Sequence, residues 1–190
     1  MGSKVAGNAK VISNVANLNQ LLDSGLTGVI IGAGNPYTRE KIYHQLIQTC
    51  PTLEIISTID PTAIIEPDVK IGKGAYIGPL SRVGVSTTLG DFVAVNPHAN
   101  VGHDCTVSDY VGVLSCAHLS GNVSVGKYTL IGANAAIRQG AKIGENVVVG
   151  MGANVITHLN NNQVVVGSPA RFLRAHAYGE DPFTQIQKTI

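Results

Sequence analysis

Aliphatic residues recur at every sixth position over more than half of the chain. From Ile59 to Val155, all seventeen positions of this series hold Ile, Val or Leu. A second series begins at Ala63, four residues after the first aliphatic residue, and holds mostly small or β-branched residues up to Leu159. Glycine often follows the aliphatic residue directly, as at Gly72 and Gly84, and glycine tolerates the backbone angles of a tight corner. A period of six does not serve a helix of 3.6 residues per turn.

The repeat predicts a triangular prism of short strands. Each six-residue unit is one strand and one bend, so three units close a coil of about 18 residues, and coils stack at the strand spacing of about 4.8 Å. The aliphatic residue of each unit points inward, and each such side chain contributes about 1.5–3 kcal/mol when it is buried. Because no unit is stable alone, stacking must make the core continuous. We therefore expect a parallel β-helix over residues 59 to about 160, with no long loop projecting from its middle.

The chain before the repeat has a different pattern. Residues 17–23 predict a short helix with Asn17 as N-cap, and residues 37–49 predict a second helix that Asn35 and Pro36 open. Residues 28–32 and 53–56 predict two short strands. Together they indicate a piece of an α/β domain.

Three parts follow from these patterns. We expect a partial α/β domain over residues 1–57, the β-helix over 58–174 and a C-terminal tail over 175–190. The tail is expected to be a short helix or a loose end that caps the last coil, whose strand edges would otherwise be unpaired.

Composition narrows the function classes. Charged residues make up only 13% of the chain, against about 25% in ordinary globular proteins, which favours buried contacts between subunits. The net charge of +1 gives no argument for binding nucleic acid or an acidic membrane. The sequence has no signal peptide and no membrane-spanning run, and its three cysteines are too few for a disulfide framework. A cytoplasmic protein is predicted.

The segment from Asn96 to Asp104 is the main candidate for chemistry. It holds His98 and His103, and His103 is followed directly by a carboxylate that can orient its ring and raise its basicity. His103 lies on an exposed part of its unit, although an ordinary exposed histidine is the simpler alternative. Cys105 occupies an inward position, which predicts an inert buried thiol. The Gly32–Gly34 turn lacks the remaining residues of a dinucleotide site.

The repeat, the stretch NPHANVGHDCTVSDYVGVLSCAHLSGNVSVG (96–126) and the closing VVVGSPARFLR (164–174) resemble the bacterial NeuD/PglD-type sugar acyltransferases. Residues 28–46 are similar to the second half of that family's N-terminal domain, so the α/β segment looks truncated. The family includes N-acetyltransferases of nucleotide-linked aminosugars and sialic acid O-acetyltransferases, which serve the synthesis of cell-surface polysaccharides.

The resemblance implies a left-handed β-helix, a homotrimer and acetyl-CoA in the groove between neighbouring prisms, with no metal. It implies that His103 is the general base and that Asp104 orients its ring. The remaining positions that match the family are those along the cofactor, Gly121, Ala133, Gly150 and Met151, and a substrate contact at Asn96.

The chain departs from the family at one site position. Many relatives carry a second histidine where this chain has Gly112, and we expect nearby His118 to replace it or the contact to be missing. Arg171 and Arg174 are candidate contacts for the CoA phosphates, with plain surface charges as the alternative.

Three hypotheses about the function remain open at this point. The first is acetyl transfer to the amino group of a nucleotide-linked 4-amino-dideoxysugar, or to a hydroxyl of sialic acid. The second is a metalloenzyme that resembles the γ-class carbonic anhydrases, because His98 and His103 have the spacing of two zinc ligands, although a third is missing upstream. The third is a trimeric scaffold without catalysis.

Overall fold

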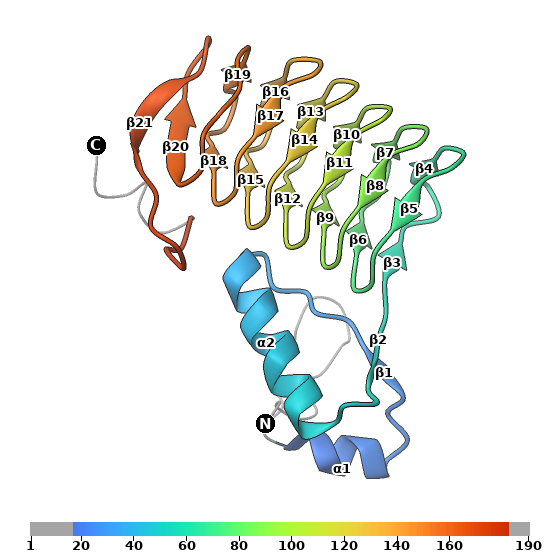
Figure 1. The fold of residues 1–190 in the computed structure, drawn as a ribbon. Coiled ribbons are helices and arrows are strands. Elements are labelled where there is room, and N and C mark those ends of the chain that lie inside the picture. The colour runs from blue at the N-terminus through green and yellow to red at the C-terminus, as the bar shows by residue number, and fades with distance from the viewer. Residues whose placement is uncertain (1–16, 183–190) are drawn as a thin grey trace.

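The computed structural model describes residues 17–182 and places them in two parts. A prism of stacked coils forms the larger part, and a smaller helical unit lies against one of its edges (Figure 1). Within residues 17–182, neither helix is long and apolar enough to cross a membrane.

The N-terminal unit has the predicted order of elements with shorter strands. It consists of α1 (Leu18–Asp23), β1 (Gly28–Val29), α2 (Pro36–Thr49) and β2 (Glu54–Ile55), and the two strands pair in parallel. The side chain of Asn35 accepts hydrogen bonds from the Tyr37 and Thr38 N–H groups at 2.9 and 3.1 Å, so it caps α2 as expected. Asn17 occupies the N-cap position of α1 as expected, but its side chain makes no capping hydrogen bond.

The prism has three faces, each a sheet of parallel strands one coil apart (Figure 1). The first face contains β3 (Thr58–Ile59), β6 (Tyr76–Ile77), β9 (Ala94–Val95), β12 (Gly112–Val113), β15 (Leu130–Ile131), β18 (Val148–Val149), β20 (Gln163–Val166) and the antiparallel β21 (Arg171–Ala175). The second face contains β4 (Ile64–Ile65), β7 (Arg82–Val83), β10 (Asn100–Val101), β13 (His118–Leu119), β16 (Ala136–Ile137) and β19 (Asn154–Val155). The third face contains β5 (Lys70–Ile71), β8 (Thr88–Leu89), β11 (Thr106–Val107), β14 (Ser124–Val125) and β17 (Lys142–Ile143).

The second residue of each of these two-residue strands points into the prism, which confirms the predicted aliphatic series. From Ile77 to Val155, every member of the series is at most 4% exposed. Ile59 is 47% exposed because it lies in the first coil, where the prism is open. The hydroxyls of buried Thr87 and Thr129 in the second series donate to the carbonyls of Gly102 and Gly144 at 2.7 and 2.8 Å, so these polar side chains are satisfied inside the core.

The glycines after the aliphatic residues serve close stacking rather than corner angles, which corrects the expectation. A Cβ at Gly72 would lie 2.5 Å from the backbone of the next coil, and one at Gly84 would lie 2.7 Å from it. The left-handed backbone angles occur later in the bend, for example at Asp104 and Asn122 with φ of 55° and 58°. Short polar side chains of this kind tolerate such angles.

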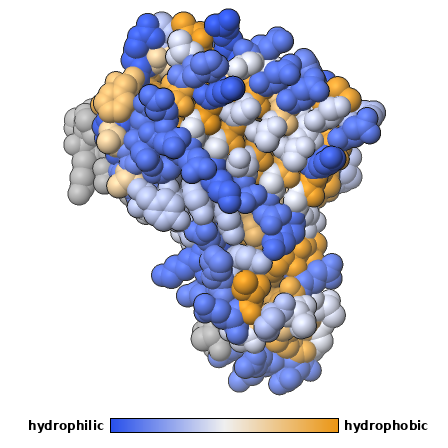
Figure 2. Space-filling model, in the orientation of Figure 1, coloured by the Kyte–Doolittle hydropathy of each residue, from blue (hydrophilic) through white to orange (hydrophobic). Residues whose placement is uncertain are grey.

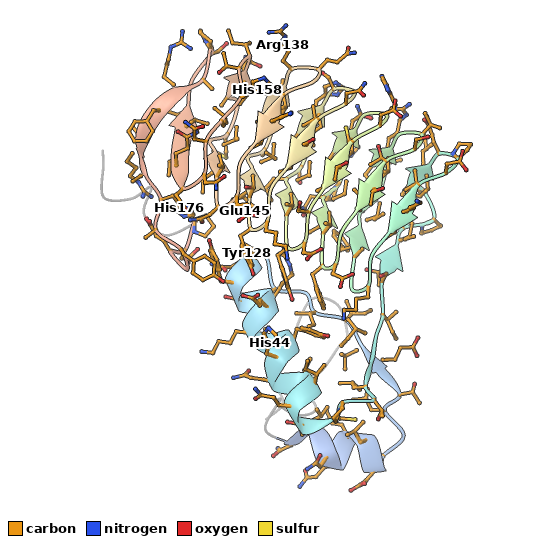
Figure 3. The ribbon with its side chains drawn as sticks, in the orientation of Figure 1. His44, Tyr128, Arg138, Glu145, His158 and His176 are labelled. Atoms are coloured by element: carbon orange, nitrogen blue, oxygen red, sulfur yellow. The ribbon has the colours of Figure 1, made fainter. Side chains whose placement is uncertain are left out.

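An aromatic column joins the N-terminal unit to the prism. Phe92, Tyr110 and Tyr128 occupy successive bends between the third and first faces, with ring centroids 5.0 and 5.5 Å apart. Tyr37 of α2 stacks on Tyr128 at 5.1 Å, and the Tyr128 hydroxyl donates to Glu40 at 2.6 Å. Tyr128 lies where the start of α2 meets the prism (Figure 3). We call this column the aromatic edge.

The chain after the repeat covers the last coil. Strand β21 pairs antiparallel with β20, and the following residue, His176, is only 2% exposed and donates its N–H to the Asn162 carbonyl at 3.0 Å. Of the expected tail, Ala175 ends β21 and residues 176–182 contain no helix, whereas residues 183–190 lie outside the described residues.

Candidate functional site

His103 and Asp104 form the bend between β10 and β11, where the second face turns into the third. This position leaves half of the His103 side chain exposed, as expected. Nδ1 of His103 lies 2.7 Å from Oδ2 of Asp104. Because a carboxylate only accepts, Nδ1 carries the proton and Nε2 of the neutral ring keeps a free lone pair. We call the column of bends that contains His103 and Gly121 the His103 edge.

Gly121 occupies the same place one coil further along. The His103 ring lies directly against it, because a Cβ on Gly121 would be 2.3 Å from Nε2 and 2.4 Å from Cε1. The Gly121 N–H donates no hydrogen bond to any of residues 17–182. A proton acceptor and a free backbone donor therefore lie side by side, which is the combination that acyl transfer requires.

Cys105 lies behind this bend and takes no part in the exposed site. The residue is 1% exposed, its thiol donates to the Ser120 carbonyl at 3.2 Å, and burial raises its pKa. Each property keeps the sulfur protonated and out of reach of a reactant.

The other candidates from the sequence lie along the opposite edge of the second face. Ala133 and Met151 begin the bends after β15 and β18, and Gly150 directly precedes Met151. Asn96 directly precedes the bend after β9. We call this column of bends the Met151 edge. Within one chain, the width of the second face separates these residues from His103, so the candidates form two groups.

His118 does not replace a side chain at Gly112. Gly112 is in β12 on the first face, whereas His118 is in β13 on the second face. Side chains on two faces of a prism point away from each other, so the expected substitution within one chain is wrong. Arg174 of β21 pairs with Glu180 of the tail at 2.8 Å, so its charge is already partly compensated.

The second face carries a row of polar side chains that was not predicted from the sequence. Arg82 Nε donates to Glu66 Oε1 at 2.9 Å, and Arg82 Nη1 donates to Asn100 Oδ1 at 3.2 Å. Asn100 Nδ2 lies 2.8 Å from His118 Nδ1. The pKa of Glu66 is below its ordinary value because its carboxylate accepts the Val85 N–H and, second, pairs with Arg82. The period contains the signal for this row, because residues 18 apart are neighbours.

A cleft of about 290 Å³ separates the N-terminal unit from the first face. Residues 30–34 form one wall, and Asn96 and Gly112 are among the residues of the other. Arg39 also lines it, although it is only 3% exposed, and burial lowers its pKa to about 10. The guanidinium donates to the carbonyls of Ala33, Gly34 and Tyr110 at 2.8–2.9 Å, which fixes this wall to the prism.

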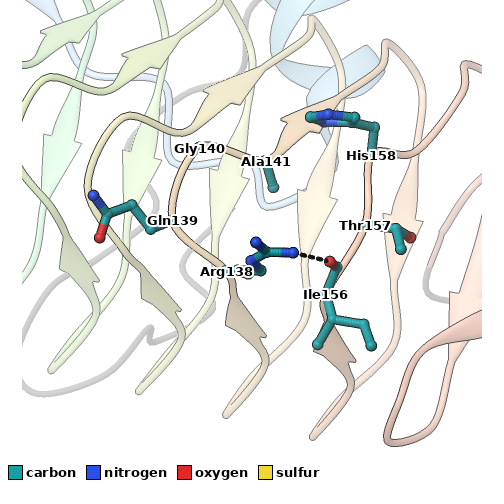
Figure 4. A pocket seen from close by; sticks show the side chains of 7 residues that line it. All are labelled: Arg138, Gln139, Gly140, Ala141, Ile156, Thr157 and His158. Carbon is teal, nitrogen blue, oxygen red and sulfur yellow. Dashed lines mark hydrogen bonds between the residues drawn. The ribbon is translucent and has the colours of Figure 1, made fainter.

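A second pocket of about 340 Å³ lies further along the His103 edge (Figure 4). Gln139, which lines it, follows Gly121 in the column of bends. Arg138 donates to the Ile156 carbonyl at 3.2 Å across the pocket, and His158 Nδ1 accepts the Lys142 N–H at 2.9 Å. The pocket is open to solvent, and it lies on the same side of the prism as His103.

Apolar side chains are exposed around the second face. They are Ile64, Leu80, Met151 and Ile156, which are 58%, 58%, 76% and 47% exposed. The space-filling view also shows apolar surface between rows of polar side chains on the prism (Figure 2).

Metal ligands are not gathered in one place in the part of the chain that the structure describes. Residues 17–182 contain no group of three or more His, Cys, Asp and Glu that could hold a metal ion. His98 lies on the Met151 edge and His103 on the His103 edge, five residues of extended chain apart.

Comparison with known proteins gives a consistent result. The family model described as bacterial transferase hexapeptide (six repeats) matches residues 122–157. No curated protein sequence matches the chain.

Solved structures match over most of the chain. The acetyltransferase domain of PglB from Neisseria gonorrhoeae, in complex with acetyl coenzyme A, is 30% identical with a TM-score of 0.84, over 91% of this chain and 82% of that one. WeeI from Acinetobacter baumannii is 27% identical with a TM-score of 0.79, over 91% and 82%. PerB from Caulobacter crescentus, in complex with CoA and GDP-perosamine, is 25% identical with a TM-score of 0.84, over 88% and 80%.

Proposed function

Since the chain belongs to the sugar acetyltransferases of the hexapeptide-repeat superfamily, whose fold is a left-handed parallel β-helix, we propose a specific reaction for it. It transfers the acetyl group of acetyl-CoA to the amino group of a nucleotide-linked 4-amino-dideoxysugar, with His103 as general base. The observation that carries this proposal is the half-exposed His103 side chain, whose Nε2 lies against Gly121 and whose Nδ1 meets Asp104. The PerB structure with CoA and GDP-perosamine supports the class of acceptor.

The geometry provides each part of a direct transfer. The acceptor nitrogen attacks the thioester carbonyl while Nε2 of His103 takes a proton from it, a step that typically gives about 10²–10⁴-fold in rate. The Gly121 N–H is free to bind the oxyanion that develops, and one such donor is worth about 2.7–4 kcal/mol. Asp104 stabilises the imidazolium, which then protonates the leaving thiolate of CoA as the C–S bond breaks.

The two reactants have separate places in this proposal. The acceptor occupies the cleft of the neighbouring chain, between its residues 30–34 and its first face, where Asn96 of that neighbour contacts it. Acetyl-CoA runs past Gly121 of one chain and along Ala133, Gly150 and Met151 of its neighbour. Each site is therefore completed by a second copy in a homotrimer.

Two observations support that assembly. Within one chain the two groups of candidate residues lie on opposite edges of the second face, and only a neighbouring copy can bring them together. The apolar residues exposed there, such as Ile64 and Leu80, are the kind of surface that a subunit contact buries. The three free cysteines fit a reducing compartment, so the cytoplasm stays the predicted location.

Replacement of His103 by alanine tests the reaction. Turnover is followed by thiol release from CoA, and the product is identified by mass spectrometry. We expect the variant to lose at least about 10²-fold in kcat while it keeps acetyl-CoA affinity and the mass of the assembly in light scattering. Turnover near that of the unchanged protein would remove His103 from the mechanism.

The acceptor is tested in the same assay with two compounds. A nucleotide-linked 4-aminosugar should gain the mass of one acetyl group. Acetylation of sialic acid in its place would replace the proposed acceptor and leave the role of His103 standing.

A further inference from the structure

The polar row on the second face fixes the orientation of an amide. Strands β7, β10 and β13 pair in parallel and place Arg82, Asn100 and His118 directly beside one another. A guanidinium has donors only, so the atom of Asn100 that Arg82 meets must be the carbonyl oxygen Oδ1. The NH₂ group of the amide therefore points to His118.

Arg82 is held firmly enough to impose this orientation. Its Nε donates to Glu66 Oε1 at 2.9 Å, and the other carboxylate oxygen of Glu66 accepts the Val85 N–H at 2.9 Å. The carboxylate thus anchors the guanidinium to the backbone of the prism. The donor and the acceptor of each hydrogen bond in the row, from Glu66 through Arg82 and Asn100 to His118, are therefore assigned.

The end of the row determines where His118 carries its proton. The Asn100 amide donates to Nδ1 of the ring at 2.8 Å, so Nδ1 is the acceptor and the neutral ring has its hydrogen on Nε2. A proton on Nδ1 would face the amide N–H directly and is disfavoured. His103 has the opposite arrangement, because its Nδ1 faces a carboxylate.

His118 is exposed and lies close to the proposed reaction. It begins β13 and precedes Gly121 of the following bend by three residues, which is at most about 10 Å along the chain. The His103 ring lies against that glycine. Since His118 begins β13, it lies on the second face between the Met151 edge and the His103 edge, the two edges that the proposed cofactor site brings together.

We propose that His118 is a second binding residue of the transfer site, which donates its Nε2–H to an oxygen acceptor of a bound reactant. That oxygen belongs to an amide carbonyl of the pantetheine arm or to a hydroxyl of the sugar. Glu66, Arg82 and Asn100 are positioning residues that keep the ring in its donor form. The inference rests on the proposed function, because it assumes those two reactants.

Asn100→Asp is the sharpest perturbation of the row. The aspartate has the same shape and still accepts from Arg82, but it puts an oxygen in place of the NH₂ group. Nδ1 of His118 must then carry the hydrogen, and at a pH where the ring is neutral Nε2 becomes an acceptor. Two-dimensional ¹H–¹⁵N spectra of the ligand-free protein with ¹⁵N-labelled histidine rings report the tautomer. We expect the Nε2–H form in the unchanged protein and the Nδ1–H form in this variant.

Kinetics measure what the donor does. Asn100→Asp and His118→Ala should each raise the KM of one reactant about tenfold, with a smaller change in kcat, since one hydrogen bond is lost. The double variant should show no larger increase in KM than either single variant. His118→Gln, whose amide can present an N–H at a similar place, should restore most of the affinity. An effect on acetyl-CoA identifies the carbonyl, and an effect on the acceptor identifies the hydroxyl.

Two results would overturn the inference. One is an Nδ1–H form of His118 in the unchanged protein, and the other is unchanged KM values for both reactants in Asn100→Asp and His118→Ala. Failure of the proposed function has a different signature, because the unchanged protein would then transfer no acetyl group. In that case calorimetry compares the variants with CoA and, separately, with the nucleotide-linked 4-aminosugar, and equal affinities for both compounds would reject the role of His118.

Discussion

Replacement of Gly121 by alanine tests the placement of the His103 ring without touching the ring itself. The three atoms nearest to the added methyl group all belong to the His103 imidazole, the nearest being Nε2 at 2.3 Å. The backbone at Gly121 does not require glycine, because the left-handed residue of this bend is Asn122 with φ of 58°. The substitution therefore moves the ring and leaves the coil intact.

The size of the effect follows from these distances. Ordinary contacts of a Cβ begin at 3.4 Å, so the ring must retreat by about 1 Å from its present position. A misplacement of about 1 Å in a reacting group costs on the order of 10²-fold in rate. This corresponds to about 2.7 kcal/mol of lost transition-state stabilisation.

The assay compares kcat and thermal unfolding of Gly121→Ala in two backgrounds. In the otherwise unchanged protein we expect kcat to fall about 10²-fold with the midpoint of unfolding nearly the same. In the His103→Ala background the methyl group meets no ring, so it should cost little further activity. Full activity of the single variant would refute the reasoning, and so would an equal loss in both backgrounds, which would indicate damage at the Gly121 N–H.

Three further substitutions probe other parts of the structure. Asp104→Asn should lower kcat by about tenfold in initial-rate assays, which is a smaller loss than that of His103→Ala. The loss is smaller because the pair of His103 and Asp104 is half exposed, so solvent screens its charge interaction. Ile131→Ala should lower the free energy of unfolding by about 2–5 kcal/mol in urea titrations, since the side chain is fully buried, while Ile131→Val should cost only about 0.5–1.5 kcal/mol. Arg39→Met should leave the carbonyls of Ala33, Gly34 and Tyr110 without their donor. Limited proteolysis should then cleave α2 before the prism, and equal protection of α2 in the variant and the wild-type protein would contradict this.

Much of the prism is predictable from the sequence because its period is short and unbroken. The spacing of six assigns every inward residue from Ile77 to Val155, and a spacing of 18 pairs each strand with its neighbour one coil away. The same rule places His103 beside Gly121, so this part of the site follows from numbering alone. The cap of α2 by Asn35 is local and was also predictable.

Other details depend on atoms that the period does not specify. The glycines after the aliphatic residues were assigned to corners, yet their reason is the approach of the next coil to 2.5 Å at Gly72. One of the two alternatives for Gly112 had His118 in place of the missing side chain, although the two residues belong to different faces. Both points have one cause, because a linear pattern gives the order of units but not which side chains share a surface.

The sequence by itself determined the β-helix, its inward register and the exposed imidazole of His103, since each depends on repeats and neighbours along the chain. Only the tertiary structure decided how the N-terminal unit lies on the aromatic edge, where buried Arg39 fixes one wall of the cleft. It also decided the tautomer-setting row from Glu66 to His118. The period places Arg82, Asn100 and His118 side by side, but it does not specify which of their atoms form hydrogen bonds, and it says nothing of contacts with segments outside the repeat.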